Sequence, residues 1–292
     1  MTILLQNAIF GTLIGGLYGL AAVGLSLVFG VLQMLNVAHG ELIMLGGYAG
    51  FWLFTLWHID PFISFILSGL GLFGAGIVLY LAMFSRLIRF DDETKLKNSV
   101  LIGFGLSLVM ETLAILAWNA DERAITTAYS GAVFPLGGSV VPLSRLGALM
   151  IAFLVLGGLH LFLHRTYLGK AIRATAADVE AASLAGIPVP TVFVMAFGLG
   201  SALAGIAGTL VSMTDAISPS IGLGWTLKAL IVVVLGGMGN IFGTFVAGLF
   251  LGVAESMSSF FLGNAYREVM GLFLFLLALS VRPQGLFTRR SG

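Results

Sequence analysis

The sequence predicts an all-α protein that crosses a membrane many times. Of the 292 residues, 59% are hydrophobic and only 9% are charged. A soluble domain carries roughly 25% charged residues, so this chain cannot cover a surface that faces water. Its apolar residues form runs close to the ~20 residues that a spanning helix needs, and its 40 glycines favour close helix packing. We expect residues 1–292 to form a single transmembrane domain of about eight to nine hydrophobic helical elements.

The first half of the chain holds five apolar runs, at residues 3–32, 41–57, 61–84, 99–118 and 146–163. Gly11, Gly15 and Gly19 recur every four residues in the first run, which predicts a stripe where another helix packs closely. Between the runs, we expect a charged loop over residues 85–98 and the longest loop over residues 119–145.

The second half continues with runs at residues 190–213, 225–237, 241–257 and 266–281. The run at 225–237 is too short to cross a membrane alone, and the glycine-rich segment Gly236–Asn240 interrupts it. We expect this stretch and the next run to enter the membrane and leave it again. One of nine elements is then a half-span, and eight full spans is the alternative.

Two interrupted segments resemble each other, one around residues 30–40 and one around residues 235–240, and a glycine-containing helix follows each. Paired breaks of this kind predict a possible internal pseudo-symmetry and a transport pathway. Broken backbone is tolerated at membrane depth only where it is buried in protein or lines a cavity. We therefore assign the translocation pathway or its gate to residues of both breaks, namely Asn36, His39, Glu41, Gly236, Gly237, Gly239 and Asn240.

Glu41 has two interpretations. An acidic residue at a helix start complements the macrodipole, so we favour capping of the second run. A buried carboxylate in a gate or a proton relay is the alternative. Glu111, Lys228 and Glu255 also lie within or near apolar runs and need partners or water, which the sequence does not identify.

Residues 164–189 are the longest polar interruption with helical character. The stretch from Lys170 to Ala185 is rich in Ala and free of Gly and Pro, which predicts one helix. Gly186 and then Pro188 end it. Because a short helix outside the membrane has little of its own to bury, we expect it to dock into a partner.

Lysine and arginine are distributed unevenly between the connections. If residues 164–189 are cytoplasmic, only Arg123, Arg145 and Arg267 fall outside the cell. The positive-inside rule then predicts an external N-terminus and a cytoplasmic C-terminus. The cations placed in the cytosol are Arg86, Arg89, Lys95, Lys97, Arg165, Lys170, Arg173, Arg282, Arg289 and Arg290.

No residue pattern indicates an enzyme. The motifs G-x-S-x-G and H-E-x-x-H are absent, and without a P-loop the chain is not expected to bind ATP itself. Four His and no Cys make a dedicated metal site improbable. The net charge of +1 gives no reason to expect nucleic acid. We expect no cofactor on this chain.

Four short motifs resemble those of one transporter family. Glu180-Ala181-Ala182 with Gly186 matches the E-A-A-x-x-x-G loop of ABC importer permeases. Three further segments are similar to those of branched-chain amino-acid permeases: N-V-A-H-G-E at 36–41, V-L-G-G-M-G-N at 234–240 and R-P-Q-G-L-F at 282–287. The first commonly has an aromatic residue where this chain has Val37. The motifs follow the family's order over nearly the whole chain, which thus resembles a permease subunit of branched-chain amino-acid-type ABC importers.

The resemblance implies ATP-driven import of branched-chain or other small amino acids across a bacterial cytoplasmic (inner) membrane. ATP and Mg would bind to partners. The implied partners are a second homologous permease, two ATP-binding cassette subunits and a periplasmic or lipid-anchored solute-binding protein. Residues 164–189 would be the coupling loop, with ATPase contacts assigned to Arg173, Ala174, Ala177, Asp178, Glu180, Ala181, Ala182 and Gly186. A permease for urea or short amides, a small-solute channel and a secondary transporter are the alternatives.

Overall fold

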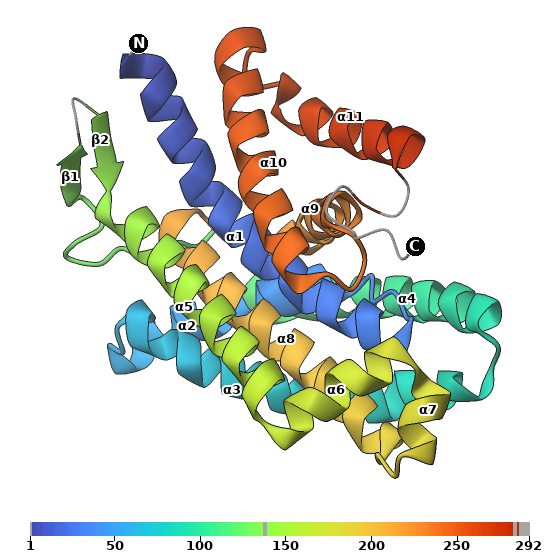
Figure 1. The fold of residues 1–292 in the computed structure, drawn as a ribbon. Helices are drawn as coiled ribbons and strands as arrows, with labels where there is room; N and C mark the ends of the chain where they lie inside the picture. The colour runs from blue at the N-terminus through green and yellow to red at the C-terminus, as the bar shows by residue number, and fades with distance from the viewer. Residues whose placement is uncertain (1, 137–138, 283–284, 286–292) are drawn as a thin grey trace.

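Apolar helices form most of the fold, and Figure 1 shows their arrangement. The structure is a computed structural model that describes residues 2–136, 139–282 and 285. Within these residues, the apolar helices are α1 (Thr2–Leu32), α2 (His39–Trp57), α3 (Pro61–Leu79), α4 (Asp92–Trp118), α5 (Leu143–Arg165), α8 (Val189–Thr214), α9 (Ile221–Gly236), α10 (Ile241–Leu262) and α11 (Tyr266–Val281).

Six of the described helices are long and apolar enough to cross a membrane, by length and composition. They are α1, α3 with its extension to Arg89, α4, α5, α8 and α10. Helices α9 and α11 have only 16 residues each, so helix length alone does not single out α9 as the predicted half-span. The all-α, multi-pass architecture expected from the sequence is therefore confirmed.

The predicted charged loop at residues 85–98 is wrong in its extent. Helix α3 continues through a π-helical turn, η1 (Tyr80–Phe84), and a 3-10 turn, η2 (Ser85–Arg89), and α4 already begins at Asp92. The Asp91 side chain caps α4 by accepting a hydrogen bond from Thr94 N at 3.1 Å. Acidic residues in the first turn favour this start. The polar stretch is thus mostly helical.

The long loop at 119–145 also contains secondary structure. Strands β1 (Val133–Leu136) and β2 (Ser139–Pro142) pair antiparallel within it. The hairpin lies beside the first residues of α5, near the N-terminal end of α1 (Figure 1). Short-range hydrophobicity had not indicated it.

The predicted glycine stripe of α1 faces α10. A Cβ at Gly15 would lie 2.8 Å from the carbonyl oxygen of Gly248, and one at Gly11 would lie 2.6 Å from the Cα of Val253. Side chains cannot be accommodated at such separations, so glycine lets the two backbones approach.

Helix α8 lies at the centre and packs against α1, α2 and α3. A Cβ at Gly46 of α2 would lie 2.5 Å from the Gly205 carbonyl oxygen on α8. On the α3 side, the hydroxyls of Ser68 and Thr209 share a hydrogen bond of 2.6 Å. Glycine contacts and buried hydroxyls together make this part of the bundle tightly packed.

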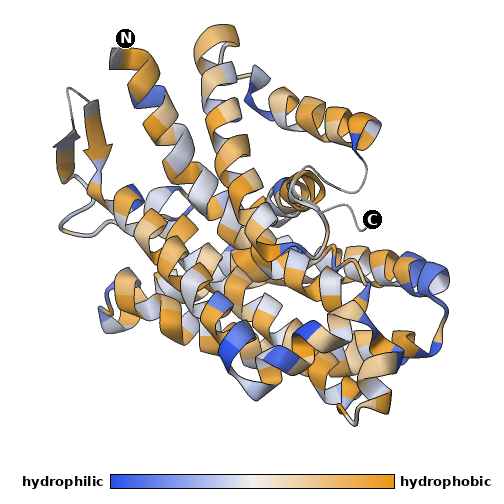
Figure 2. Ribbon diagram, in the orientation of Figure 1, coloured by the Kyte–Doolittle hydropathy of each residue, from blue (hydrophilic) through white to orange (hydrophobic). Residues whose placement is uncertain are grey.

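The connections gather at two ends of the bundle. Tyr129 of the long loop donates to Asp60 between α2 and α3, and Arg123 N donates to the Ile217 carbonyl between α8 and α9 at 2.8 Å. The opposite end carries α6 (Tyr167–Ala177), α7 (Val179–Leu184) and the start of α4 (Figure 1). Hydrophilic residues concentrate there, while the outward faces of the long helices are hydrophobic (Figure 2).

Candidate functional site

The first break lies between α1 and α2. Polar side chains from the break itself, from α4 and from α9 bond its backbone. Asn36 Oδ1 accepts from Ala38 N at 3.1 Å within the break itself. Ser99 Oγ of α4 accepts from Leu35 N at 3.0 Å. Thr226 of α9 also bonds this backbone. From Met34 to Ala38 the broken backbone is therefore buried or partly buried in protein, as expected for membrane depth, whereas Gln33 is exposed.

Thr226 bonds two backbone groups of the first break at once. Its Oγ1 donates to the Val37 carbonyl and accepts from Gly40 N, both at 2.9 Å. Gly40 lies so close to α9 that a Cβ there would overlap the Gly222 carbonyl oxygen. The start of α2 is therefore fixed against α9.

His39 and Glu41 are both buried at the start of α2. His39 Nε2 donates to the Ala21 carbonyl of α1 at 2.9 Å. Glu41 Oε1 accepts from Ser107 Oγ of α4 at 2.9 Å, and the same carboxylate lies against Gly222. Glu41 is in the first helical turn, as expected, but its side chain makes no capping hydrogen bond there, because it points between α4 and α9.

The second break, between α9 and α10, is built from glycine. Gly237 and Gly239 adopt positive φ of 95° and 83°, which glycine tolerates best. Asn240 Oδ1 accepts from Gly243 N at 3.0 Å and caps α10. A Cβ at Gly30, near the end of α1, would lie 2.8 Å from the Cα of Gly239. The second break therefore packs directly against the last turn of α1, which leads into the first break.

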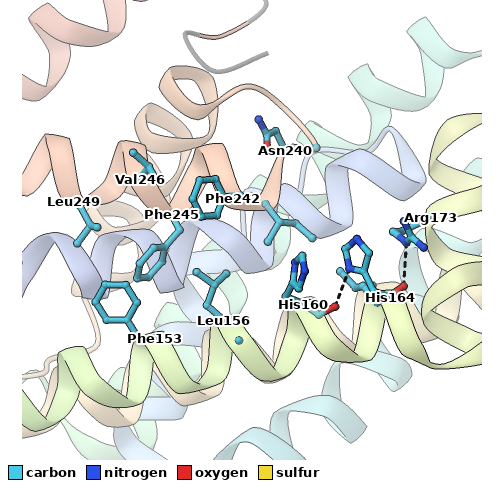
Figure 3. Close-up of a pocket in the computed structure, with 14 residues that line it drawn as sticks. Phe153, Leu156, His160, His164, Arg173, Asn240, Phe242, Phe245, Val246 and Leu249 are labelled. Atoms are coloured by element: carbon cyan, nitrogen blue, oxygen red, sulfur yellow. Dashed lines mark hydrogen bonds between the residues drawn. The ribbon is translucent and has the colours of Figure 1, made fainter. Parts of the chain in front are cut away.

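A groove of about 690 Å³ lies between α5 and α10, and we call it the α5–α10 groove. Figure 3 shows phenylalanine and aliphatic side chains along most of its length and polar side chains at one end. The apolar lining includes Phe153, Leu156, Phe242, Phe245, Val246 and Leu249. Such a lining suits an apolar solute portion more than a fully polar one.

The polar end of the groove is formed by His160, His164 and Arg173. The two imidazole rings stack with centroids 4.0 Å apart. Arg173 Nε donates to the Leu163 carbonyl at 2.9 Å, which ties α6 to α5 (Figure 3). The sequence analysis did not assign any α5 residue to the pathway, although α5 forms one wall of the groove. The available signal was the spacing of His160 and His164, which are four residues apart and so share a helix face.

The predicted pathway residues divide into two groups. Gly239 and Asn240 line the α5–α10 groove, whereas Asn36, His39 and Glu41 do not and lie among α1, α4 and α9. Gly236 also stays outside the groove lining, since it packs against Thr244 of α10.

The predicted single helix from Lys170 to Ala185 is wrong: α6 ends at Ala177 and α7 begins at Val179. Asp178 separates them, with its side chain accepting from Ala181 N at 2.9 Å. Asp competes in this way for backbone N–H groups and favours cap positions over helix interiors. Gly186 has φ of 81°, which fits the sharp turn that ends α7.

Most of the coupling residues proposed from the sequence are solvent-exposed: Arg173, Ala174, Ala177, Asp178, Glu180, Ala181 and Gly186. Ala182 differs, because it is only 4% exposed and its carbonyl accepts from Ile187 N. Leu184, which the motif did not single out, is 90% exposed. The outward surface of α7 therefore combines Leu184 with the acidic Glu180.

A buried carboxylate, Glu255 of α10, is surrounded by donors from three other helices. Lys228 Nζ lies 2.9 Å from Oε1, Arg267 Nε lies 3.2 Å from Oε2 and Tyr18 OH donates to Oε2 at 2.9 Å. These contacts join α1, α9, α10 and α11. They supply the partners for Lys228 and Glu255 that the sequence left open.

The fold and these sites define a multi-pass membrane permease. The sequence profile of the family described as branched-chain amino acid transport system / permease component matches residues 7–279. The chain belongs to this family. The R-P-Q-G-L-F motif continues through residues 283, 284, 286 and 287, which lie outside the described residues.

Individual relatives match along nearly their whole length. The chain is 34% identical to the high-affinity branched-chain amino acid transport system permease protein BraD of Pseudomonas aeruginosa, over 98% of this chain and 96% of that protein. It is 30% identical to the permease protein LivH of Escherichia coli, with the same coverage. Among solved structures, PsaBC from Streptococcus pneumoniae in complex with Fab matches with a TM-score of 0.49 and 13% identity, over 96% of this chain and 92% of that chain.

Proposed function

We propose that this chain is the permease subunit of an ATP-driven importer for branched-chain or other small amino acids. The family match over residues 7–279 carries the proposal, supported by relatives whose names specify branched-chain amino acid transport. The chain would sit in a bacterial cytoplasmic membrane with its N-terminus outside and its C-terminus in the cytosol. A single Cys in place of Asp92 tests this orientation. An impermeant thiol reagent should label that Cys only after the membranes are opened.

Four kinds of partner complete the importer in this proposal. Two ATP-binding cassette subunits hold ATP and Mg and perform the hydrolysis, and a solute-binding protein delivers the amino acid. A second homologous permease covers the α5–α10 groove, which is open along one side of this chain and has an apolar lining. The groove would then become an enclosed path.

Coupling would begin at α7. Its exposed Leu184 offers an apolar side chain that gains burial only from a partner. Arg173 and Gly169 fasten α6 to the end of α5: Arg173 bonds the Leu163 carbonyl, and a Cβ at Gly169 would overlap the Phe162 carbonyl oxygen. A push on α7 would therefore move α5, which is one wall of the groove, relative to α10.

The apolar lining of the groove favours an amino acid with an aliphatic side chain over urea or short amides. Burial of one aliphatic side chain contributes roughly 1.5–3 kcal/mol, and Phe245, Val246 and Leu249 supply such contacts. Urea has no apolar part to match them. We therefore prefer amino-acid import.

The substitution Leu184→Asp tests the coupling role. It should leave the permease folded, because the side chain is exposed, but it should weaken ATPase attachment by placing a charge in an apolar contact. Leu184→Met, which keeps the apolar surface, is the matched control. The measurements are co-purification of the ATPases, ATP hydrolysis stimulated by loaded binding protein, and leucine uptake into proteoliposomes. Wild-type values for Leu184→Asp in all three would show that α7 is a plain connector.

A further inference from the structure

A second cavity, of about 110 Å³, lies where α1, α5, α10 and α11 meet, and we call it the Arg145–Arg267 pocket. It has the size of a few water molecules, each of which occupies roughly 30 Å³ in the liquid. Its polar lining consists of two guanidinium groups, one amide and two hydroxyls, which belong to Arg145, Arg267, Asn7, Ser256 and Ser259. Phe10 and Ile14 of α1 supply the apolar side.

Both arginines are held in place by groups of the chain itself. Arg145 Nη2 lies 3.3 Å from Asp215 Oδ1, and the Arg145 guanidinium lies 5.9 Å from the Phe10 ring centroid. Arg267 donates hydrogen bonds to the Glu255 carboxylate through Nε and to the Tyr18 hydroxyl through Nη2. A preorganised guanidinium loses less entropy when it binds a planar anion, so this arrangement favours ligand binding.

The ion pairs at the pocket and behind it contain one more cation than carboxylate, although Lys228 itself does not line the pocket. The contacts around it join three cations, Arg145, Lys228 and Arg267, to two carboxylates, Asp215 and Glu255. Arg145 makes no hydrogen bond besides that to Asp215 in the part of the chain that the structure describes. A partly buried excess of positive charge is stabilised by an anion, and a carboxylate accepts two parallel bonds from guanidinium.

The pocket is aligned with the α5–α10 groove along two shared helices. On α5, Arg145 is eight residues from Phe153 of the groove, and on α10, Ser256 is seven residues from Leu249. At 1.5 Å per residue, both separations are roughly 10–12 Å. Helix α1 lies between α5 and α10 in this half of the bundle (Figure 1). The cationic pocket and the apolar lining therefore lie at successive levels of the same two helices, with α1 between these helices at the level of the pocket.

We propose that the Arg145–Arg267 pocket is a receiving subsite for the carboxylate of the transported amino acid. The inference rests on the proposed function, because amino-acid import is its premise. The solute's carboxylate binds the two guanidinium groups first. The aliphatic side chain then has the apolar groove ahead of it in the direction of α6 and α7.

The test uses the purified complex of both permeases and both ATPases in nanodiscs, without the binding protein. The probes are radiolabelled L-leucine and unlabelled isopentylamine, which lacks the carboxylate. The wild-type complex should retain leucine, and isopentylamine should not compete at equal concentration. Arg145→Gln should weaken leucine binding about tenfold or more, since a hydrogen bond to a charged group contributes about 1.5–3 kcal/mol. Arg145→Lys should recover part of that loss.

Arg123→Gln is the control for charge at the same end of the bundle, because Arg123 does not line the pocket. It should leave leucine binding unchanged. Binding of isopentylamine as tight as leucine, or no leucine binding by the wild type, overturns the proposal. The proposal is also overturned if Arg145→Gln binds leucine normally but docks the loaded binding protein more weakly. The pocket would then be a contact with that protein. Failure of the amino-acid import assignment would appear separately, as absent leucine uptake in wild-type proteoliposomes supplied with binding protein.

Discussion

The two breaks share a sequence pattern of glycine and asparagine but hold their backbones differently. In the α1–α2 break, Ser99 and Thr226 reach in from other helices and bond the irregular backbone. In the α9–α10 break, Gly237 and Gly239 adopt positive φ, and Gly239 with Asn240 lines the α5–α10 groove. The first break is mostly covered by protein, with Gln33 exposed, and the second borders a cavity.

The difference indicates separate roles for similar segments. Backbone bonded by side chains of several helices has few alternative arrangements, so the first break is suited to anchor α2 against α4 and α9. Glycine backbone at a cavity wall has more conformational freedom. We infer that the second break is the adjustable one, and that α10 can shift there relative to α5.

The largest expected effect is in the first break, at Gly40. Gly40→Val places a branched side chain onto the Gly222 carbonyl and Thr226, a backbone contact that cannot yield locally. Overpacking typically costs about 1–3 kcal/mol and occasionally more, and contact with backbone places Gly40→Val at the upper end. We expect no folded permease after detergent extraction, as judged by size-exclusion chromatography. Gly74→Val, at a position with no described atom within 4 Å of its added Cβ, should behave as wild type. A well-folded Gly40→Val protein would show that the first break is not rigid.

A smaller loss of stability is expected for Thr226→Val. The substitution keeps the side-chain shape but leaves the Val37 carbonyl and Gly40 N–H without their bonds to Oγ1. Buried groups left unsatisfied cost about 1–3 kcal/mol, which a thermal unfolding curve detects as a lower Tm. The exposed Thr112 of α4 also bonds a backbone carbonyl, that of Leu108, and Thr112→Val is the control. Equal Tm values for the two variants would contradict the anchoring role.

The second break should show a loss of function that matched backbone strain elsewhere in the chain does not cause. Gly237→Ala strains a residue with φ of 95°, at a cost of about 1–3 kcal/mol. Gly263→Ala, with φ of 100° and no described atom within 4 Å of the added Cβ, imposes a similar strain between α10 and α11. Leucine uptake should fall for Gly237→Ala and stay near wild type for Gly263→Ala. The same uptake in both would mean that only general strain matters.

Local sequence patterns predicted much of this fold. Hydrophobic runs located the nine apolar helices, and the spacing of Gly11, Gly15 and Gly19 predicted the α1 face that meets α10. Gly186 was expected to allow a sharp turn and has positive φ. These features depend on helical periodicity and backbone sterics, which neighbouring residues determine.

The features that the sequence missed depend on competition or on distant contacts. Asp178 splits the expected helix because its carboxylate accepts a hydrogen bond from the backbone of the following turn. Summing the helix propensities of the residues does not predict this competition. Glu41 was assigned to capping, yet its partner Ser107 lies 66 positions away on α4. The α5 wall of the groove likewise becomes visible only when α5 and α10 are placed side by side.

Relative movement of α5 and α10 is the central claim, and cross-linking tests it most directly. The chain contains no Cys, so Cys pairs can be introduced cleanly. One pair, at Leu156 and Phe242, would be joined across the groove by a short cross-linker that forms a disulfide with each thiol, so that reductant releases it. The other, at Ser68 and Thr209, replaces a hydrogen bond between α3 and α8 in the tightly packed part. Bridging the groove should abolish leucine uptake until reductant is added, while bridging α3 to α8 should leave most uptake intact. Unimpaired uptake with the groove bridged would contradict the account.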